Sequence, residues 1–253
     1  GIESASDVQS MQRASRDIRQ LALNLLAQGI GAEQLTQFIS ALNDALTRRI
    51  IELNLEHHDL YGVEYAWLAF GSEGRHEQTL STDQDNGIVF RVAEGNPVDE
   101  ARRRLLAFAK TVNEDLAACG FPLCKGNIMA SNPALCLTLD GWKSRFGAWI
   151  REPQPEALLN ASIYFDFRVM YGNERLGDQL RAWLNKTVRG NSAFLRMMAA
   201  NALTVRPLTR LTQRLCPKCR RPRLSAVTTS VQPSRSSPNA TTPKTSPVQA
   251  FRL

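Results

Sequence analysis

The chain has 253 residues, a formal net charge of +7 and 43% hydrophobic residues, enough to bury a sizeable core. No apolar run approaches the roughly 18–20 residues of a membrane span and no secretory signal opens the sequence, so we expect neither a membrane partner nor export. The five cysteines are odd in number and irregularly spaced, which argues against a secreted disulfide scaffold and favours a reducing, cytoplasmic location.

The positive charge is concentrated at the end of the chain. Residues 207–253 contain nine Lys and Arg and no Asp or Glu, so subtracting nine from the net +7 leaves −2 for the first 206 residues. The basic composition therefore gives little support for nucleic-acid binding by the folded part. The same tail holds seven of the twelve prolines with many Ser and Thr, a composition that predicts disorder.

Residues 5–57 are expected to form a pair of helices that packs on the following domain. Gly29 and Gly31 mark the end of the first helix. A dimerising coiled coil is the alternative, although the stripe is short for one. The second helix has apolar residues at three- and four-residue steps: Leu35, Phe38, Ile39, Leu42, Leu46, Ile50 and Leu53.

The middle of the chain has the pattern of an α/β (α+β) domain. Apolar runs at 64–70 and 86–91 predict two strands, and residues 99–118 have helical spacing that ends before Gly120. A third strand is expected at 127–131. This strand–helix–strand order predicts a mixed sheet with flanking helices.

The segment after the third strand is expected to be mostly helical. Residues 135–151 carry a helical stripe, and the prolines at 153 and 155 interrupt it. Within the following helical region, residues 163–170 are β-prone, and a fourth strand and a buried helical turn both stay open there. The predicted organisation has four parts: a helical pair (1–60), a core domain (61–155), an incomplete helical domain (156–206) and a disordered tail (207–253).

The first two strands flank the residues that point to chemistry. Gly71 and Ser72 end the first strand, and Asp83 and Asp85 open the second, where alternate residues project from the same face. Two such carboxylates can hold one or two Mg²⁺ ions that also bridge nucleotide phosphates. Gly71 lets the backbone approach a phosphate, Ser72 can donate to it, and Arg75 offers a fork of donors. From the pattern alone, a catalytic site and a structural turn both stay open.

These residues carry a family resemblance. Gly-Ser followed by Asp-x-Asp resembles the signature of the DNA polymerase beta-type nucleotidyltransferase superfamily. The fuller string GSEGRHEQTLSTDQDN at 71–86 is similar to a narrower group, the nucleotidyltransferases of the DUF294 type, which are related to the uridylyltransferase domain of PII-modifying enzymes. The stretches CKGNIMASNP at 124–133 and YFDFRVMYG at 164–172 also resemble that group, and the similarity covers about residues 10–205.

The resemblance implies a polymerase beta-like sheet and roles for particular residues. It implies that Asp83 and Asp85 are metal ligands and that Gly71 and Ser72 bind the triphosphate of an NTP. Members of the superfamily use a third carboxylate, for which Asp166 is the candidate. The alternative for Asp166 is a structural pair with Arg168 or a helix cap.

The implied reaction is the Mg²⁺-dependent transfer of a nucleoside monophosphate from an NTP to an acceptor, with release of pyrophosphate. By similarity to the uridylyltransferases, the acceptor is expected to be a signalling protein. Two alternatives stay open: a nucleotide-binding regulatory module without turnover, and nucleic-acid binding through the basic tail. Because the family often carries cyclic-nucleotide-binding and CBS domains before this region, we expect regulatory domains upstream of Gly1, and a truncated or frameshifted end would explain the tail.

Overall fold

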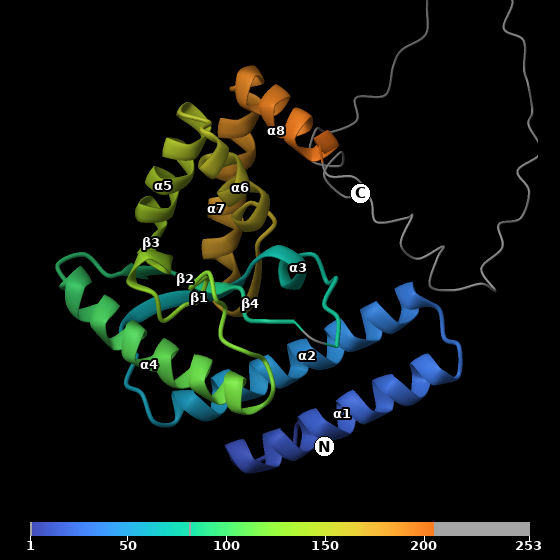
Figure 1. Cartoon of the computed structure of the whole chain (residues 1–253). Helices are drawn as coiled ribbons and strands as arrows, with labels where there is room; N and C mark the ends of the chain where they lie inside the picture. The colour runs from blue at the N-terminus through green and yellow to red at the C-terminus, as the bar shows by residue number, and fades with distance from the viewer. Residues whose placement is uncertain (1, 81, 205–253) are drawn as a thin grey trace, which may run out of the picture. The chain divides into compact units, whose positions relative to one another are not determined.

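The computed structural model describes residues 2–80 and 82–204 (Figure 1). Residues 2–195 belong to a first compact unit, and helix α8 (Ser192–Thr204) begins in this unit and continues past it. The predicted disordered tail, residues 207–253, lies outside the described residues. Within the described ranges, no helix is both long and apolar enough to cross a membrane.

The first unit is built on a four-stranded mixed sheet, which confirms the predicted α/β class. The strands are β1 (Val63–Ala69), β2 (Asn86–Val92), β3 (Cys136–Thr138) and β4 (Arg168–Gly172), in the spatial order β3-β2-β1-β4. β1 is antiparallel to both β2 and β4, whereas β3 runs parallel to β2. A parallel neighbour requires a crossover connection, and α4 (Val98–Ala118) provides it.

The third strand predicted at residues 127–131 is wrong. This segment is a loop that meets β2 at one backbone hydrogen bond, from Asn86 N to Ile128 O at 3.1 Å. Asn127 has a φ of 55°, a left-handed conformation that interrupts an extended chain. The parallel strand forms later, at β3, after the short 3-10 turn η1 (Pro133–Leu135).

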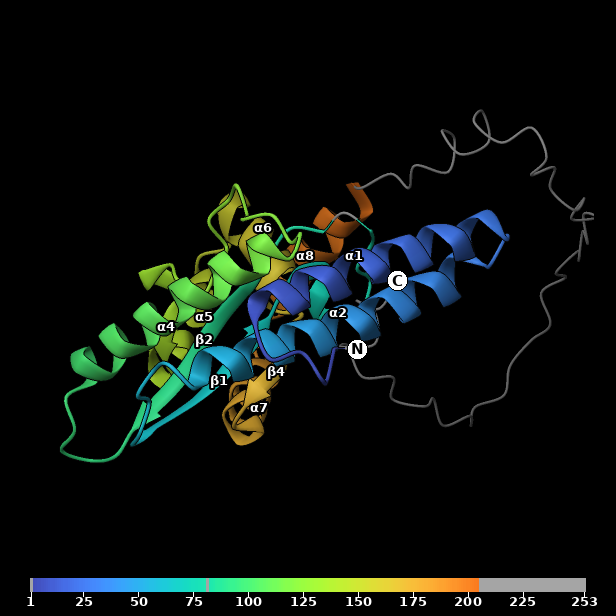
Figure 2. The same cartoon turned by 90° about the horizontal axis from the view of Figure 1, so that it is seen from below.

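One face of the sheet is covered by the predicted helical pair, α1 (Val8–Ala27) and α2 (Ala32–Leu55), together with α4 (Figures 1 and 2). The core on this side contains residues from strands and helices alike, among them Trp67, Ile88, Phe90, Leu46, Ile50, Phe108 and Leu105. The apolar side chains of α2 therefore pack in the core of this chain, and this packing disfavours the dimerising coiled coil.

The opposite face is covered by α5 (Leu139–Arg151), α6 (Pro155–Tyr164) and α7 (Glu174–Arg189) (Figure 1). Trp142 of α5 donates its indole N–H to the carbonyl of Ile88 at 2.9 Å, so this helix is fixed directly to β2. Of the β-prone stretch at 163–170, residues 163 and 164 end α6 and residues 168–170 begin β4, so a helical turn and a fourth strand both occur there.

We expect Gly172→Ala to destabilise the protein more than Gly95→Ala. Both glycines have left-handed φ angles, +94° and +86°, which an alanine adopts at a cost of about 1–2 kcal/mol. At Gly172 an added Cβ would also lie 2.4 Å from the Tyr65 carbonyl oxygen, whereas nothing lies within 4 Å at Gly95. The overlap should add about 1–3 kcal/mol, measured by urea denaturation. Equal losses of unfolding free energy in the two variants would contradict the packing of β4 on β1.

Candidate active site

The pairing of β1 with β2 brings the two halves of the sequence motif together. Beyond the last ladder pair, Phe70 N donates to the carbonyl oxygen of Asp85 at 2.8 Å. The next residue, Gly71, has a φ of +52°, and a Cβ added there would lie 3.2 Å from Asp85 Oδ2. Glycine is favoured at this position both by the left-handed backbone and by the nearby carboxylate.

Residues Gly71–Gly74 form α3, a single helical turn at the end of β1. No side-chain hydrogen bond caps this turn, and within the described part of the chain the hydroxyl of half-buried Ser72 has no hydrogen-bond partner. At Gly74 a Cβ would lie 1.9 Å from the backbone oxygen of Asp166, so α3 packs directly on the chain before β4. The turn thus has a fixed position and a free hydroxyl.

The acidic pair, Asp83 and Asp85, lies just before β2. Buried amide side chains fix the backbone that carries the pair. Gln84 is buried, whereas Asp83 is exposed and Asp85 is half-buried. The Gln84 amide donates to the carbonyls of Asn113 and Phe121, both at 2.9 Å, and accepts from the Asn113 amide at 2.7 Å. The three hydrogen bonds orient Gln84 into the interior.

The same network fixes the first residue of β2. Asn86 Oδ1 accepts from the amide of Asn113 at 3.0 Å and from the backbone N–H of Ala130 at 2.8 Å. Satisfied buried networks of this kind rigidify the backbone that carries them. The carboxylates of Asp83 and Asp85 are therefore presented from a firmly held segment.

The electrostatics of the acidic pair suit a cation. Burial raises the pKa of Asp85 to about 6, the thiol of Cys124 opposes this by a hydrogen bond, and the negative charge of Asp83 adds to the rise. Among the described residues, no Lys or Arg forms an ion pair with Asp83 or Asp85. Two neighbouring carboxylates without a cationic partner repel each other, and a divalent ion would relieve the repulsion.

Two carboxylates are a donor set that is compatible with Mg²⁺. Across residues 2–80 and 82–204, no three or more His, Cys, Asp or Glu side chains gather into a group that could hold a metal. Mg²⁺ is usually bound by one or two carboxylates together with substrate phosphates and waters, rather than by an all-protein cage. Asp83 and Asp85 supply this number of carboxylates.

Arg75 and Asp166 are brought together by the fold, although 91 residues separate them. Arg75 contacts Asp166 at 3.3 Å and Glu77 at 2.8 Å, and about a third of its side chain is exposed. Asp166 is therefore paired with Arg75 and not with Arg168, the partner considered from the sequence. A role for Asp166 as the third carboxylate stays a prediction.

Arg168 instead joins three elements beneath the turn. It forms an ion pair with Asp44 of α2 at 2.6 Å, and its Nε donates to the backbone oxygen of Glu73 in α3 at 3.0 Å. His76 Nδ1 lies 3.6 Å from the same Asp44 carboxylate. The pair was not expected from the sequence because 124 residues separate Asp44 from Arg168.

Two further groups beside the motif were not expected as site neighbours. Burial raises the pKa of Glu73 to about 8, and the positive charge of Arg168 opposes this rise. Burial raises the pKa of the Cys124 thiol, and the Asp85 carboxylate adds to this rise. Glu73 lies inside the motif and Cys124 inside the second similar stretch, but neither spacing predicts these contacts.

A protein-family model described as "Putative nucleotidyltransferase DUF294" matches residues 16–156, more than half of the chain. The matched part includes the turn at Gly71 and Ser72, the acidic pair and the loop that carries Cys124, whereas Asp166 and Arg168 lie beyond it. No curated protein matches the chain.

We expect Arg168→Gln to destabilise the protein by up to about 3–5 kcal/mol, because it leaves the largely buried Asp44 carboxylate with only the more distant His76 as a partner. The two side chains are only 17% and 15% exposed. Arg103→Gln is the matched control, since its pair with Glu100 is 77% and 40% exposed and should contribute less than about 1 kcal/mol.

Chemical denaturation of both variants and of the double variant Asp44→Asn/Arg168→Gln measures the coupling. The double variant should be more stable than Arg168→Gln alone, because no unpaired carboxylate remains. If Arg168→Gln behaves like Arg103→Gln, the network does not support the turn.

Proposed function

Since the chain belongs to the DUF294 family of nucleotidyltransferases, we propose that it transfers a nucleoside monophosphate from an NTP to an acceptor and releases pyrophosphate, with Mg²⁺ as cofactor. The observation that carries the proposal is the approach of Gly71 to the Asp85 carboxylate, with Asp83 beside it. This geometry supports a phosphate-binding turn and a metal-binding pair within one site.

Different residues of the chain would bind the metal and the triphosphate. Asp83 and Asp85 would hold the metal, which when bound neutralises phosphate charge and assists departure of pyrophosphate. Gly71 leaves space for a phosphate close to the backbone, and Ser72 has an uncommitted hydroxyl to donate to it. Arg75 brings a positive charge to the same turn.

The proposed chemistry is an in-line displacement at the α-phosphorus. The acceptor hydroxyl loses its proton to a carboxylate, its oxygen forms a bond to the α-phosphorus, and the bond between that phosphorus and the bridging oxygen of pyrophosphate breaks. We assign the proton acceptor to Asp166, which reaches the turn through its contact with Arg75. A signalling protein as the acceptor is part of the proposal, on the resemblance to the uridylyltransferases.

A nucleotide-binding regulatory module without turnover is the second candidate. One observation favours it: within the described residues, Asp166 is committed to Arg75 and does not join the acidic pair in a group of three acids. Such a site could bind a metal–nucleotide complex without a base for the acceptor. Nucleic-acid binding through the basic tail concerns residues outside the described ranges and gains no support here.

Asp83→Asn should lower nucleotidyl transfer at least about 100-fold, because it removes one of two carboxylates that would hold the metal. The assay incubates the protein with each of four α-labelled NTPs, Mg²⁺ and fractionated cell protein as acceptor, and follows label transfer and pyrophosphate release. Asp17→Asn, an exposed carboxylate on α1, is the matched control and should leave transfer unchanged.

The same experiment distinguishes the two candidate functions. Saturable NTP binding with no pyrophosphate release in the wild type would support the regulatory module. No binding of any NTP would contradict both functions.

Mg²⁺ together with a non-hydrolysable NTP should raise the melting temperature of the wild type but not of Asp85→Asn. Without metal, Asp85→Asn should melt no lower than the wild type, because the substitution removes the repulsion from Asp83. Calorimetry with EDTA as the reference measures both effects. A Mg²⁺ response that survives in Asp85→Asn would place the metal elsewhere.

A further inference from the structure

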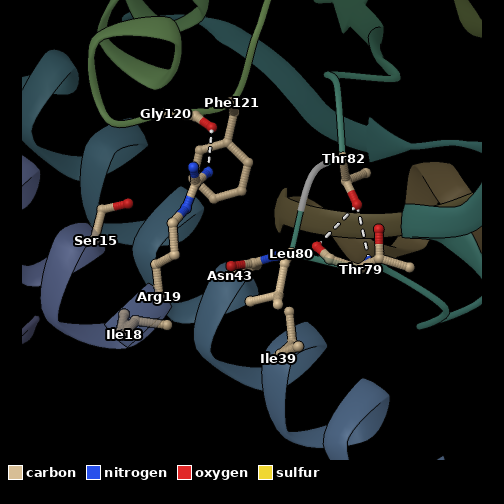
Figure 3. Close-up of a pocket in the computed structure, with 10 residues that line it drawn as sticks. All are labelled: Ser15, Ile18, Arg19, Ile39, Asn43, Thr79, Leu80, Thr82, Gly120 and Phe121. Atoms are coloured by element: carbon tan, nitrogen blue, oxygen red, sulfur yellow. Dashed lines mark hydrogen bonds between the residues drawn. The ribbon is translucent and has the colours of Figure 1, made fainter. Parts of the chain in front are cut away.

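The cavity behind the motif does not extend the candidate site. It has a volume of about 30 Å³ and lies between α1, α2 and the segment that contains Thr79, Leu80 and Thr82 (Figure 3). A space of this size holds one or two water molecules, so a nucleotide at Gly71 does not reach into it. Further contacts to a nucleotide must come from another side of the turn, and α6 packs on α3 there.

Tyr164, the last residue of α6, lies beside this turn. Its ring centroid is 5.0 Å from that of Phe70 in an edge-to-face arrangement and 5.3 Å from that of Trp149, on which it stacks. Phe70 immediately precedes Gly71 and donates its backbone N–H to the carbonyl oxygen of Asp85 at 2.8 Å. The two ring contacts therefore hold Tyr164 next to both halves of the motif.

The hydroxyl of Tyr164 is available to a ligand. The residue is only 7% exposed, and a largely buried tyrosine usually pairs its hydroxyl. In the part of the chain that the structure describes, this hydroxyl has no hydrogen-bond partner, and the oxygen is not fully shielded from solvent. The ring is thus fixed by packing while its polar end remains open to another molecule.

The charges that act on the phenol place it near the acidic pair. Burial raises the pKa of Tyr164, and the positive charge of Arg145 opposes this rise. The negative charges of Asp85 and Cys124 add to the rise. The phenol therefore keeps its proton at neutral pH, and it can act as a hydrogen-bond donor beside the place where a metal and a phosphate are proposed to bind.

We propose that Tyr164 is a substrate-binding residue whose hydroxyl donates to a phosphate oxygen of the bound triphosphate. The inference rests on the proposed function and adds α6 to the nucleotide site. The phosphates are the part of the nucleotide in question, because the ring of Tyr164 packs on Phe70, which leads directly into the turn at Gly71 and Ser72. In the bound state the hydroxyl would exchange water for a charged acceptor, which strengthens the hydrogen bond.

Tyr164→Phe removes only the hydroxyl and tests the proposal by calorimetric titration. One arm uses Mg²⁺ with a non-hydrolysable NTP, and the other uses Mg²⁺ with inorganic tripolyphosphate. The Kd for both ligands should rise about tenfold, the loss expected for one hydrogen bond to a charged group. Without ligand the variant should melt no lower than the wild type, because no hydrogen bond within the chain is lost.

Tyr171→Phe is the matched control. Tyr171 lies on β4, is half-buried and also has no hydrogen-bond partner for its hydroxyl among the described residues. It packs against the core on the α2 side of the sheet, and the carboxylate that raises the pKa of its phenol further, after burial, is Glu52. This variant should bind both ligands with the wild-type Kd.

The outcomes separate this inference from the proposed function. A wild type that binds no NTP in the presence of Mg²⁺ would contradict the proposed function and the role of Tyr164 together. A wild type that binds NTP, with equal affinities in Tyr164→Phe and Tyr171→Phe, would contradict the role of Tyr164 alone. Weaker binding of NTP with unchanged binding of tripolyphosphate would place the hydroxyl at the nucleoside and overturn the phosphate contact.

Discussion

The candidate site depends on one close approach, that of the Gly71 backbone to the carboxylate of Asp85. It follows from the antiparallel pairing of β1 with β2, which places the end of one strand beside the start of the next. A side chain at Gly71 would meet Asp85 Oδ2 at 3.2 Å, so the residue that we propose leaves space for a phosphate lies against a carboxylate that we propose holds the metal. Ser72 and Asp83 gain their proposed roles from this contact.

Different contacts support the two halves of the site, the acidic pair and the turn that begins at Gly71. Behind the acidic pair, Gln84 and Asn86 are anchored by Asn113 of α4. Beneath the turn, Arg168 connects α3 to Asp44 of α2. The helical pair at the N-terminus is therefore part of the support of the site.

Local patterns in the sequence predict most of the fold and the position of the motif. The helical stripe of α2, the two strands around Gly71 and Asp85, and the crossover helix all follow from the spacing of apolar residues. The strand expected at residues 127–131 fails because Asn127 adopts a left-handed conformation, which residue type alone does not specify. The pairing of Arg168 with Asp44 and of Arg75 with Asp166 depends on tertiary contacts between distant segments, so no local pattern reveals it.

The central claim is that Asp83 and Asp85 hold a metal beside a phosphate bound at Gly71 and Ser72. Anomalous diffraction from crystals grown with Mn²⁺ and a non-hydrolysable NTP tests it most directly. The predicted result is a manganese peak in contact with both carboxylates and with the triphosphate, whose oxygens lie against the turn of α3. A nucleotide bound away from Gly71 and Ser72, with no manganese at the acidic pair, would contradict the account.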